Sequence, residues 1–362
     1  MARRGHAGRS PEDPPMLETD ARRALIDAWL TRELRLSLTR LEPASSDASF
    51  RRYFRAYSGA RTYIVMDAPP GKEDVRPYLK VTGLLEGMGV HVPHVHHADT
   101  ARGLLLLEDL GSTLYLERLS AGQDSEALYG AALDALATIQ VRGGAACPEL
   151  APYGRAELAR EMALLPEWFL TRHLGLALSA AESQLLAGTC EFLIGEALAQ
   201  PVVFVHRDYH SRNLMVLAER GPGVIDFQDA LAGPAGYDLV SLLKDCYIAW
   251  PRERVEGWVR AFRARLLRRG GAAADSEQQF LRWFDLIGVQ RHLKVLGIFC
   301  RLWYRDGKQG YLADLPRTLA YVEDACARYA ELAPLGGFLA ARVSGALAVA
   351  NAREAQRPVP PA

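Results

Sequence analysis

One stretch of the sequence gathers the side chains that phosphoryl transfer requires. It reads His206-Arg207-Asp208-Tyr209-His210-Ser211-Arg212-Asn213, and Ile225-Asp226-Phe227 follows, with Asp226 thirteen residues after Asn213. Transfer of a phosphoryl group from a nucleotide needs a carboxylate beside the acceptor hydroxyl and oxygen ligands for the metal ion that neutralises the phosphates. An aspartate five residues before an asparagine, with a second aspartate after the next aliphatic run, can supply both. We therefore predict Asp208 as the catalytic base, with Asn213 and Asp226 as magnesium ligands.

Two histidines and a further aspartate accompany this motif. His206 precedes the base by two residues, and we expect it to pack against the loop backbone. His210 follows the base by two residues, and two roles stay open: an electrophile toward the transferred phosphoryl group, or a residue that stabilises the loop. Asp238 begins an apolar helical pattern, which is typical of a residue that caps a helix.

The elements that must position these groups change character along the chain. Before residue 109, alternating and β-branched runs predict an antiparallel hairpin over residues 50–66 and further strands at Val90–Val95 and Gly103–Leu107. After it, helical periodicity predominates. Short aliphatic strands remain at Val202–Val205, Leu214–Leu217 and Gly223–Ile225. The predicted helices cover residues 124–141, 155–173, 179–199, 238–249, 251–269, 276–303 and 314–332.

These patterns predict an α+β fold with two lobes. We expect a disordered tail over residues 1–15, a small β-rich lobe over 16–108, a larger and mainly helical lobe over 109–352, and a flexible tail over 353–362. The catalytic base and both metal ligands fall in the larger lobe.

Composition narrows the class of protein. The chain has 362 residues, 49% of them hydrophobic, and its 43 basic residues balance 43 acidic ones. A net charge of zero argues against a protein that binds nucleic acid or an anionic membrane surface. The five cysteines are dispersed and form no CxxC pair, as in a cytoplasmic protein. No signal peptide is evident, and the apolar run Gly336–Ala350 is too short for a membrane span, so an amphipathic helix is expected there.

With these motifs in view, the sequence resembles the aminoglycoside phosphotransferase-like branch of the protein-kinase-like superfamily over residues 20–335. Within that branch, five further phrases resemble the bacterial kinases that phosphorylate N-acetylmuramate and N-acetylglucosamine at C1 during cell-wall recycling. The phrases lie at Ser46–Tyr53, Tyr63–Pro70, Leu106–Gly111, Ile225–Ala230 and Gln290–Lys294. The resemblance implies a bilobal kinase fold, ATP and magnesium as cofactors, and a small amino sugar as the partner, in a cytoplasmic monomer. It also adds a second role for Asp238, that of bracing the catalytic loop.

The resemblance also assigns nucleotide contacts. The segment Glu108–Leu110 corresponds to the hinge, whose backbone would bind adenine, and Ser46–Phe50 occupies the place of the loop over the phosphates. Small residues such as Ser46 and Ser49 can allow a backbone to approach phosphate closely, although a plain hairpin turn explains the segment equally well.

One departure from the family pattern concerns the phosphate-pairing lysine of the third strand. It should fall near Val65 or Met66, and neither residue is basic. Loss of that cation would remove charge stabilisation from the transferring group. Arg51, Arg52 or Arg55 could supply it, with Arg52 our choice, whereas a solvated strand face accounts for at least one of the three.

The acceptor side carries less specific signals. Asp229 could face the sugar or hydrogen-bond its own loop. Arg291, His292 and Lys294 could reach a carboxylate or acetamido group, although each could equally lie on a solvated helix face. Two alternatives to an amino-sugar kinase stay open: a kinase of another small hydroxyl acceptor, such as an aminoglycoside or amino alcohol, and a nucleotide-binding pseudokinase.

Overall fold

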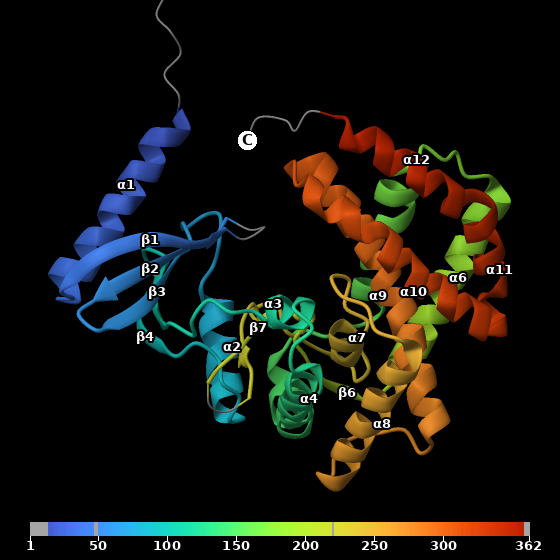
Figure 1. The fold of residues 1–362 in the computed structure, drawn as a ribbon, viewed down its shortest axis with the longest axis horizontal. Coiled ribbons are helices and arrows are strands. Elements are labelled where there is room, and N and C mark those ends of the chain that lie inside the picture. The colour runs from blue at the N-terminus through green and yellow to red at the C-terminus, as the bar shows by residue number, and fades with distance from the viewer. Residues whose placement is uncertain (1–13, 47–49, 219–220, 358–362) are drawn as a thin grey trace, which may run out of the picture. The chain divides into compact units, whose positions relative to one another are not determined.

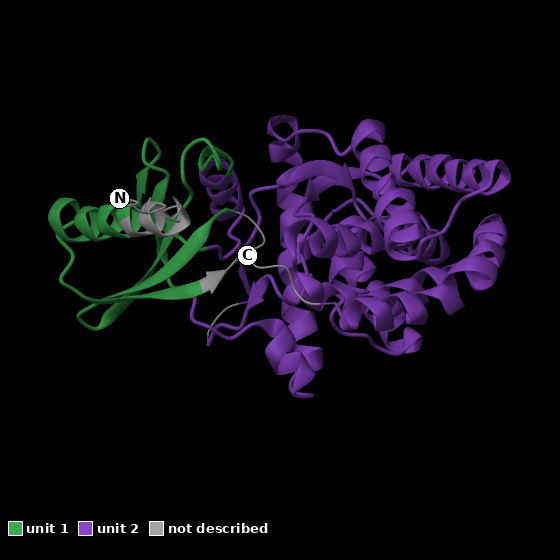
Figure 2. Cartoon of the chain, turned by 90° about the horizontal axis from the view of Figure 1, so that it is seen from above, with its two compact units in different colours: residues 1–77, 93–109 green, residues 78–92, 110–362 purple. Residues whose placement is uncertain are grey.

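The five-stranded sheet and most of the helices lie in different units of the fold. A computed structural model describes residues 14–46, 50–218 and 221–357 and divides the chain into two units (Figure 2). Unit 1 comprises residues 1–77 and 93–109, and unit 2 comprises residues 78–92 and 110–362.

The sheet of unit 1 is antiparallel, in the order β1-β2-β3-β5-β4. Its strands are β1 (Leu38–Ser46), β2 (Arg52–Ser58), β3 (Arg61–Asp67), β4 (Val95–Asp99) and β5 (Leu104–Glu108). Helix α1 (Pro14–Ala28) and the π-helical turn η1 (Trp29–Glu33) precede it and can be followed in blue in Figure 1.

Alternation along the strands decides which face of the sheet is covered. Successive side chains of a strand point to opposite faces, so Phe54 and Ala56 of β2 share one face. Trp29 and Leu30 pack in the same buried cluster as these residues and Val65 of β3. The helical N-terminal segment therefore covers this face.

Unit 2 is mainly helical and is built around the long helix α9 (Figure 1). Its α-helices are α3 (Tyr115–Ser120), α4 (Ser125–Arg142), α5 (Arg155–Met162), α6 (Ala180–Leu198), α7 (Tyr237–Leu243), α8 (Arg252–Arg268), α9 (Glu277–Asp306), α10 (Leu315–Arg328), α11 (Ala333–Phe338) and α12 (Ser344–Ala355), and α2 (Arg76–Gly87) lies almost wholly in the same unit. Shorter helical turns are η2 (Gly143–Glu149), η3 (Leu165–His173), η4 (Gln309–Asp314), η5 (Ala330–Leu332) and η6 (Leu339–Val343).

Two small antiparallel sheets carry the motif residues of unit 2. Strand β6 (Val202–Val205) pairs with β9 (Leu231–Pro234), and β7 (Leu214–Met215) pairs with β8 (Gly223–Val224). The first motif leaves the end of β6, and the second follows β8. Short buried strands thus fix both ends of the segment between His206 and Asn213.

Two sequence-based predictions of elements were wrong in detail, and one strand was not predicted. The helix predicted over 238–249 ends at Leu243, because the buried carboxylate of Asp245 accepts backbone N–H groups from Ser211 and Tyr247 and holds the chain in a turn. The strand predicted at Val90–Val95 begins only at Val95. Strand β9 was not predicted, since its sequence, Leu-Ala-Gly-Pro, has little strand propensity.

The C-terminal helical run is more apolar than expected. Residues Ala330–Ala355 meet the length and hydropathy of a membrane span, and about a third of the 18-residue window is buried inside the protein. Core helices of soluble proteins meet the same criteria, so this property alone does not place the chain in a membrane.

Helix α9 is buried on all sides over its central part. Every residue from Phe284 to Gly297 is buried. At Gly297 the neighbouring helical turn η3 comes so close that a Cβ atom would lie 2.5 Å from the carbonyl carbon of Leu164. A methyl group at this position would therefore collide with backbone.

We expect Gly297→Ala to lower the free energy of unfolding by about 2 kcal/mol or more, because backbone must move to admit the methyl group. Gly288→Ala on the same helix is the matched control, since its nearest neighbour is the Val240 side chain at 3.6 Å. Higher helix propensity should make that variant neutral or slightly more stable. Denaturant unfolding of both variants measures the difference, and equal stabilities would contradict the close approach.

Candidate active site

The motif residues predicted to do chemistry meet in one loop of unit 2. The Asn213 side-chain amide donates to the carbonyl oxygen of Asp208 at 3.0 Å and to Oδ2 of Asp226 at 3.3 Å. Asp226 has a φ of 63°, in the left-handed region that few non-glycine residues adopt. Non-glycine residues in that region concentrate at functional sites.

The His206 side chain connects the segment around Asp208 with the segment around Asp226 by hydrogen bonds. Its Nε2 donates to the carbonyl oxygen of Ile225 at 3.0 Å, and its Nδ1 accepts the backbone N–H of Asp208 at 3.2 Å. Burial lowers the pKa of the ring, so it is neutral at physiological pH and can perform both functions. The structural role predicted for His206 is confirmed.

Asp238 holds the backbone before the base. Its two carboxylate oxygens accept the N–H groups of His206 at 2.6 Å and Arg207 at 3.0 Å. Burial raises the pKa of Asp238 to about 6, against the lowering influence of His206 and of the two backbone donors. Arg207 has a φ of 77°, so this carboxylate holds a residue in a conformation that costs free energy. Asp238 braces the loop and does not cap α7.

The Asp208 carboxylate lies beside a buried arginine. Nη2 of Arg291 is 3.7 Å from Oδ1 of Asp208, and the two side chains are 5% and 43% exposed. Burial raises the pKa of Asp208, but the charges of Arg291 and Lys294 hold it below its ordinary value. Asp208 is therefore ionised and accessible, as a base must be.

Arg291 is itself fixed by contacts within the fold. Its Nη1 donates to the carbonyl oxygen of Arg207 at 2.8 Å and to the hydroxyl of Tyr237 at 3.1 Å. These contacts make Arg291 a positioning residue for the base.

Glu161 compensates the other cations near the loop. Its Oε1 lies 2.5 Å from Nη2 of Arg207 and 2.7 Å from Nζ of Lys294, and its Oε2 accepts the hydroxyl of Tyr153. Burial raises the pKa of Glu161, but the charges of Lys294 and Arg207 leave it below the ordinary value. Two of the three cations are thus neutralised in part by Glu161, and Arg291 faces Asp208.

The fit of a magnesium ion can be tested on the donor groups. The Nδ2 group of Asn213 contacts both the Asp208 carbonyl and the Asp226 carboxylate, which leaves the Asn213 amide oxygen and the Asp226 carboxylate as hard oxygen ligands on neighbouring side chains. Among the described residues no group of three or more His, Cys, Asp or Glu side chains forms a metal site. Mg²⁺ commonly takes one or two protein ligands and completes its shell with phosphates and water, so this sparse set fits that ion.

His210 and Ser211 occupy the middle of the loop. The His210 backbone N–H donates to the carbonyl oxygen of Asp208 at 3.0 Å, and its ring meets Tyr247 edge-on at 5.4 Å between centroids. Its Nδ1 is buried without a hydrogen-bond partner in the described structure, and burial lowers its pKa. Ser211 donates through both its N–H and its hydroxyl to the Asp245 carboxylate. The structure is compatible with either predicted role of His210.

The predicted acceptor-side residues do not lie together. His292 donates from Nε2 to the carbonyl oxygen of Lys244 at 2.9 Å and stacks on Tyr321, and burial lowers its pKa to about 3. It is part of the core, which argues against a contact with substrate. Asp229 is exposed and accepts a hydrogen bond from its neighbour Gln228 at 3.4 Å.

The predicted nucleotide residues lie near the strand ends and hinge. Ser46 ends β1, where it pairs with Arg52 of β2, whereas Ser49 lies outside the described residues. The N–H of Glu108 donates to the carbonyl oxygen of His94 at 2.8 Å. The N–H of Leu110 has no hydrogen-bond partner in the described structure, which leaves this donor available to a ligand.

Arg52, predicted as the substitute for the missing lysine, pairs with a buried carboxylate and shares its face of the sheet with Val65 but not with Met66. Asp67 is fully buried, and its Oδ2 accepts from Nε of Arg52 at 3.0 Å while its Oδ1 accepts from Nε of Arg22 at 3.0 Å. By alternation, Arg52 and Phe54 share the face covered by η1, whereas Met66 points to the other face. Arg55 is on the Met66 face and pairs with Asp109 at 2.8 Å.

Sequence reasoning missed the residues that support the loop from a distance. Glu161 and Asp245 lie within predicted helices and were given no role of their own. Both side chains are buried. A charged residue at a core position of an apolar helical pattern was the signal that could have identified them as supports of the loop. Their partners follow only from the tertiary fold.

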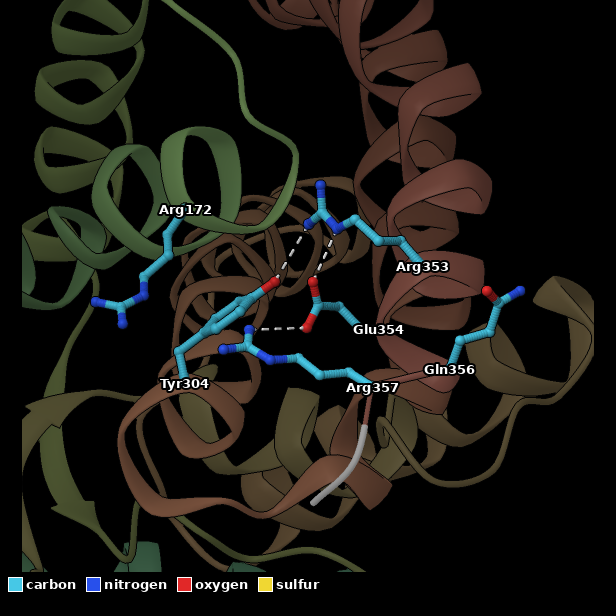
Figure 3. Close-up of a pocket in the computed structure, with 6 residues that line it drawn as sticks. All are labelled: Arg172, Tyr304, Arg353, Glu354, Gln356 and Arg357. Carbon is cyan, nitrogen blue, oxygen red and sulfur yellow. Dashed lines mark hydrogen bonds and ion pairs between the residues drawn. The ribbon is translucent and has the colours of Figure 1, made fainter. Parts of the chain in front are cut away.

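A hollow elsewhere in unit 2 is lined by Arg172, Tyr304, Arg353, Glu354, Gln356 and Arg357 (Figure 3). Glu354 pairs there with Arg353 and Arg357. Tyr304 follows Arg291 on α9 by thirteen residues, which corresponds to about 20 Å along a helix. The hollow is therefore distinct from the loop that carries Asp208.

Comparison with known proteins identifies the family. The model of the phosphotransferase enzyme family matches residues 40–284, a span that includes both motifs. The chain belongs to this family. It is a phosphotransferase, and the loop that carries Asp208 is the part of the chain in which that chemistry is expected.

Curated relatives of this phosphotransferase carry a more specific name. "N-acetylmuramate/N-acetylglucosamine kinase" of Pseudomonas aeruginosa is 50% identical over 84% of this chain and 89% of that protein. The protein of the same name from Pseudomonas putida is 43% identical over 92% of this chain and 100% of that protein. The corresponding Neisseria meningitidis protein is 45% identical over 82% of this chain and 88% of that one.

Solved structures confirm the predicted kinase-like α+β fold of the phosphotransferase. An ethanolamine kinase of Plasmodium vivax has a TM-score of 0.62 at 13% identity and covers 87% of this chain and 90% of that one. The ADP-bound aminoglycoside phosphotransferase APH(2'')-Ib has a TM-score of 0.56 at 14% identity and covers 82% of this chain and 97% of that one. At these identities the likeness concerns the fold alone.

We expect Arg291→Met to raise the pKa of Asp208 by about one unit or more, because the variant loses a cation that lowers it. In the unaltered enzyme Asp208 stays ionised to below its ordinary pKa of about 3.9, so kcat/KM between pH 5 and 8 would not show the change. The measurement is a ¹³C NMR titration of the Asp208 carboxyl group in both proteins.

Arg305→Met on the same helix is the control, since Arg305 is exposed and pairs with Asp306. Arg291→Lys should restore part of the wild-type pKa of Asp208. An unchanged pKa of Asp208 in Arg291→Met would show that Arg291 does not tune the base.

Proposed function

We propose that this phosphotransferase transfers the γ-phosphoryl group of ATP to the anomeric C1 hydroxyl of N-acetylmuramate and N-acetylglucosamine, giving the sugar 1-phosphate in peptidoglycan recycling. The observation that carries the proposal is 50% identity, over most of both chains, to a kinase named for these two sugars. The loop geometry supports the same class of reaction, because Asp208 is held ionised and accessible beside Asn213 and Asp226.

In the proposed reaction, Asp208 accepts the proton of the acceptor hydroxyl as the oxygen bonds to the γ-phosphorus. The bond from that phosphorus to the bridging oxygen breaks, and ADP leaves. Arg291 and the backbone fixed by Asp238 orient the carboxylate, which lowers the entropic cost of reaching the reactive geometry. His210 contributes at most a neutral imidazole, since burial lowers its pKa.

Magnesium and the nucleotide have proposed positions on this chain. Asn213 and Asp226 would hold Mg²⁺, which when bound neutralises charge on the phosphates. The assignment of the Glu108 and Leu110 backbone to adenine, and of Ser46 and Ser49 to the phosphates, is carried by the family resemblance. Arg52 is the weaker member of the predicted nucleotide set, because Asp67 already pairs with its guanidinium.

The names of the curated relatives favour a neutral or anionic acceptor. Charge around the loop does not decide this, because the basic residues Arg207, Arg291, Lys294 and Arg212 are matched by the acidic residues Asp208, Asp226, Asp238, Asp245 and Glu161. A cationic acceptor is the weaker alternative on similarity alone, and a pseudokinase would not need so firmly held a base.

The proposal includes the cellular setting expected from the sequence. A cytoplasmic monomer that acts on a small sugar, without nucleic acid or membrane, is consistent with zero net charge and five free thiols.

ADP release in the presence of Mg²⁺ and ATP tests the proposal directly. We expect turnover with N-acetylmuramate and N-acetylglucosamine, and little with glucose, an aminoglycoside or an amino alcohol. Asp208→Asn should lower kcat by at least about a hundredfold, because the acceptor loses its base. Asp134→Asn, a change at an exposed carboxylate of α4, is the control and should retain activity. Sugar-independent ADP release alone would defeat the proposal.

The position of phosphorylation has its own test. The methyl glycosides of both sugars lack a free C1 hydroxyl, so we expect no ADP release with them, while ³¹P NMR of the free-sugar products should show an anomeric phosphate. Turnover of a methyl glycoside would assign the reaction to another hydroxyl.

A further inference from the structure

One cation of the catalytic loop differs from its neighbours in how it is held. Arg212 immediately precedes Asn213 and is exposed to solvent. Its guanidinium lies 4.7 Å from the ring centroid of Tyr247 and 5.7 Å from that of Tyr311. It forms no ion pair with an acidic side chain in the described part of the chain. Aromatic rings orient a cation without neutralising it, so Arg212 keeps its full charge.

The aromatic support of Arg212 connects it to the base. The Tyr247 ring also meets the His210 ring at 5.4 Å, and Phe299 packs against both Tyr247 and Tyr311. The Tyr247 backbone N–H donates to the same Asp245 carboxylate that holds Ser211. The Asp245 carboxylate therefore positions both the catalytic loop, through Ser211, and the aromatic support of Arg212, through Tyr247.

Arg212 lies in the same short loop as Asp208. The side chain of the next residue, Asn213, donates to the carbonyl oxygen of Asp208 at 3.0 Å. This contact closes the loop and brings the residue that follows Arg212 against the backbone of the base.

The other cations near the base already have partners. Arg291 faces Asp208, and Arg207 and Lys294 share Glu161. The candidates named from sequence for a substrate carboxylate, Arg291 and Lys294, are thus held by internal contacts. Arg212 is the exposed cation near Asp208 that lacks an acidic partner among the described residues.

We infer that Arg212 selects for a carboxylate on the acceptor and binds the lactyl carboxylate of N-acetylmuramate, while Tyr247 and Tyr311 wall the sugar. The inference rests on the proposed function, because it takes the acceptor to lie at Asp208. Arginine suits this task, since its planar guanidinium offers paired donors to a carboxylate. N-acetylglucosamine lacks the lactyl group and would not use this contact.

The test compares kcat/KM for the two sugars in the wild type, Arg212→Gln and Arg212→Lys. We expect Arg212→Gln to lower the ratio of N-acetylmuramate to N-acetylglucosamine efficiency by about tenfold or more, the loss typical of a charge-assisted hydrogen bond. Arg212→Lys should lie between the two, and it carries the comparison if Arg212→Gln does not fold.

Arg172→Gln is a closely matched control. Arg172 is likewise exposed and lies over two aromatic rings, Trp168 at 5.1 Å and Tyr304 at 5.3 Å, but it lines the distant hollow of Figure 3. Its substitution should leave the sugar ratio unchanged and reports what loss of such a stacked arginine does to thermal stability.

A matched change in the substrate tests whether Arg212 and the lactyl carboxylate act on each other. N-acetylmuramate with its carboxylate converted to the primary amide should be a poorer substrate for the wild type by about the same factor, and Arg212→Gln should not distinguish acid from amide. If the wild type turns over neither sugar, the proposed function fails. If it turns over both but Arg212→Gln lowers them equally, or the variant still distinguishes acid from amide, the function stands and the role of Arg212 is overturned.

Discussion

The catalytic loop depends on one buried carboxylate, that of Asp238. Its two oxygens accept the backbone N–H groups of His206 and Arg207, and Arg207 has the left-handed backbone conformation that a non-glycine residue avoids. Without these two acceptors, the donors would be buried and unsatisfied, and the turn would have no compensation for its strain. The direction in which Asp208 leaves β6 follows from this contact, and so does the approach of Arg291 to the base.

The charged side chains around the loop differ in burial and in the partners they have. Buried Glu161 compensates Arg207 and Lys294, Arg291 keeps Asp208 ionised, and Arg212 remains exposed. Burial of so many charges is costly unless each has a partner, and the pairing explains why the fold tolerates them. The net charge of zero for the whole chain is thus repeated locally, because basic and acidic side chains are gathered together around the loop.

The sequence predicted the positions of site residues that lie close together along the chain, and it failed for residues whose surroundings come from distant segments. The spacing of Asp208, Asn213 and Asp226 predicted their meeting, because a loop between short strands leaves few alternatives. The sequence could not show that His292 packs in the core or that Arg52 is bound by Asp67, since exposure of one helix or strand face depends on neighbours far along the chain. Glu161 and Asp245 were missed for the same reason: their partners lie 46 and 34 residues away.

The complete burial of α9 between Phe284 and Gly297 bears on the order in which the protein can be made. Synthesis proceeds from the N-terminus, and the loop with Asp208 leaves the ribosome well before Arg291 and Lys294. Until α9 arrives, Glu161 and Asp208 lack these cations and the helices that will enclose α9 expose apolar surface to solvent. Such incomplete chains are prone to aggregation and to binding by chaperones. The last step in forming the catalytic charge is therefore also the step that closes the core, so an unfinished chain cannot carry a finished active site.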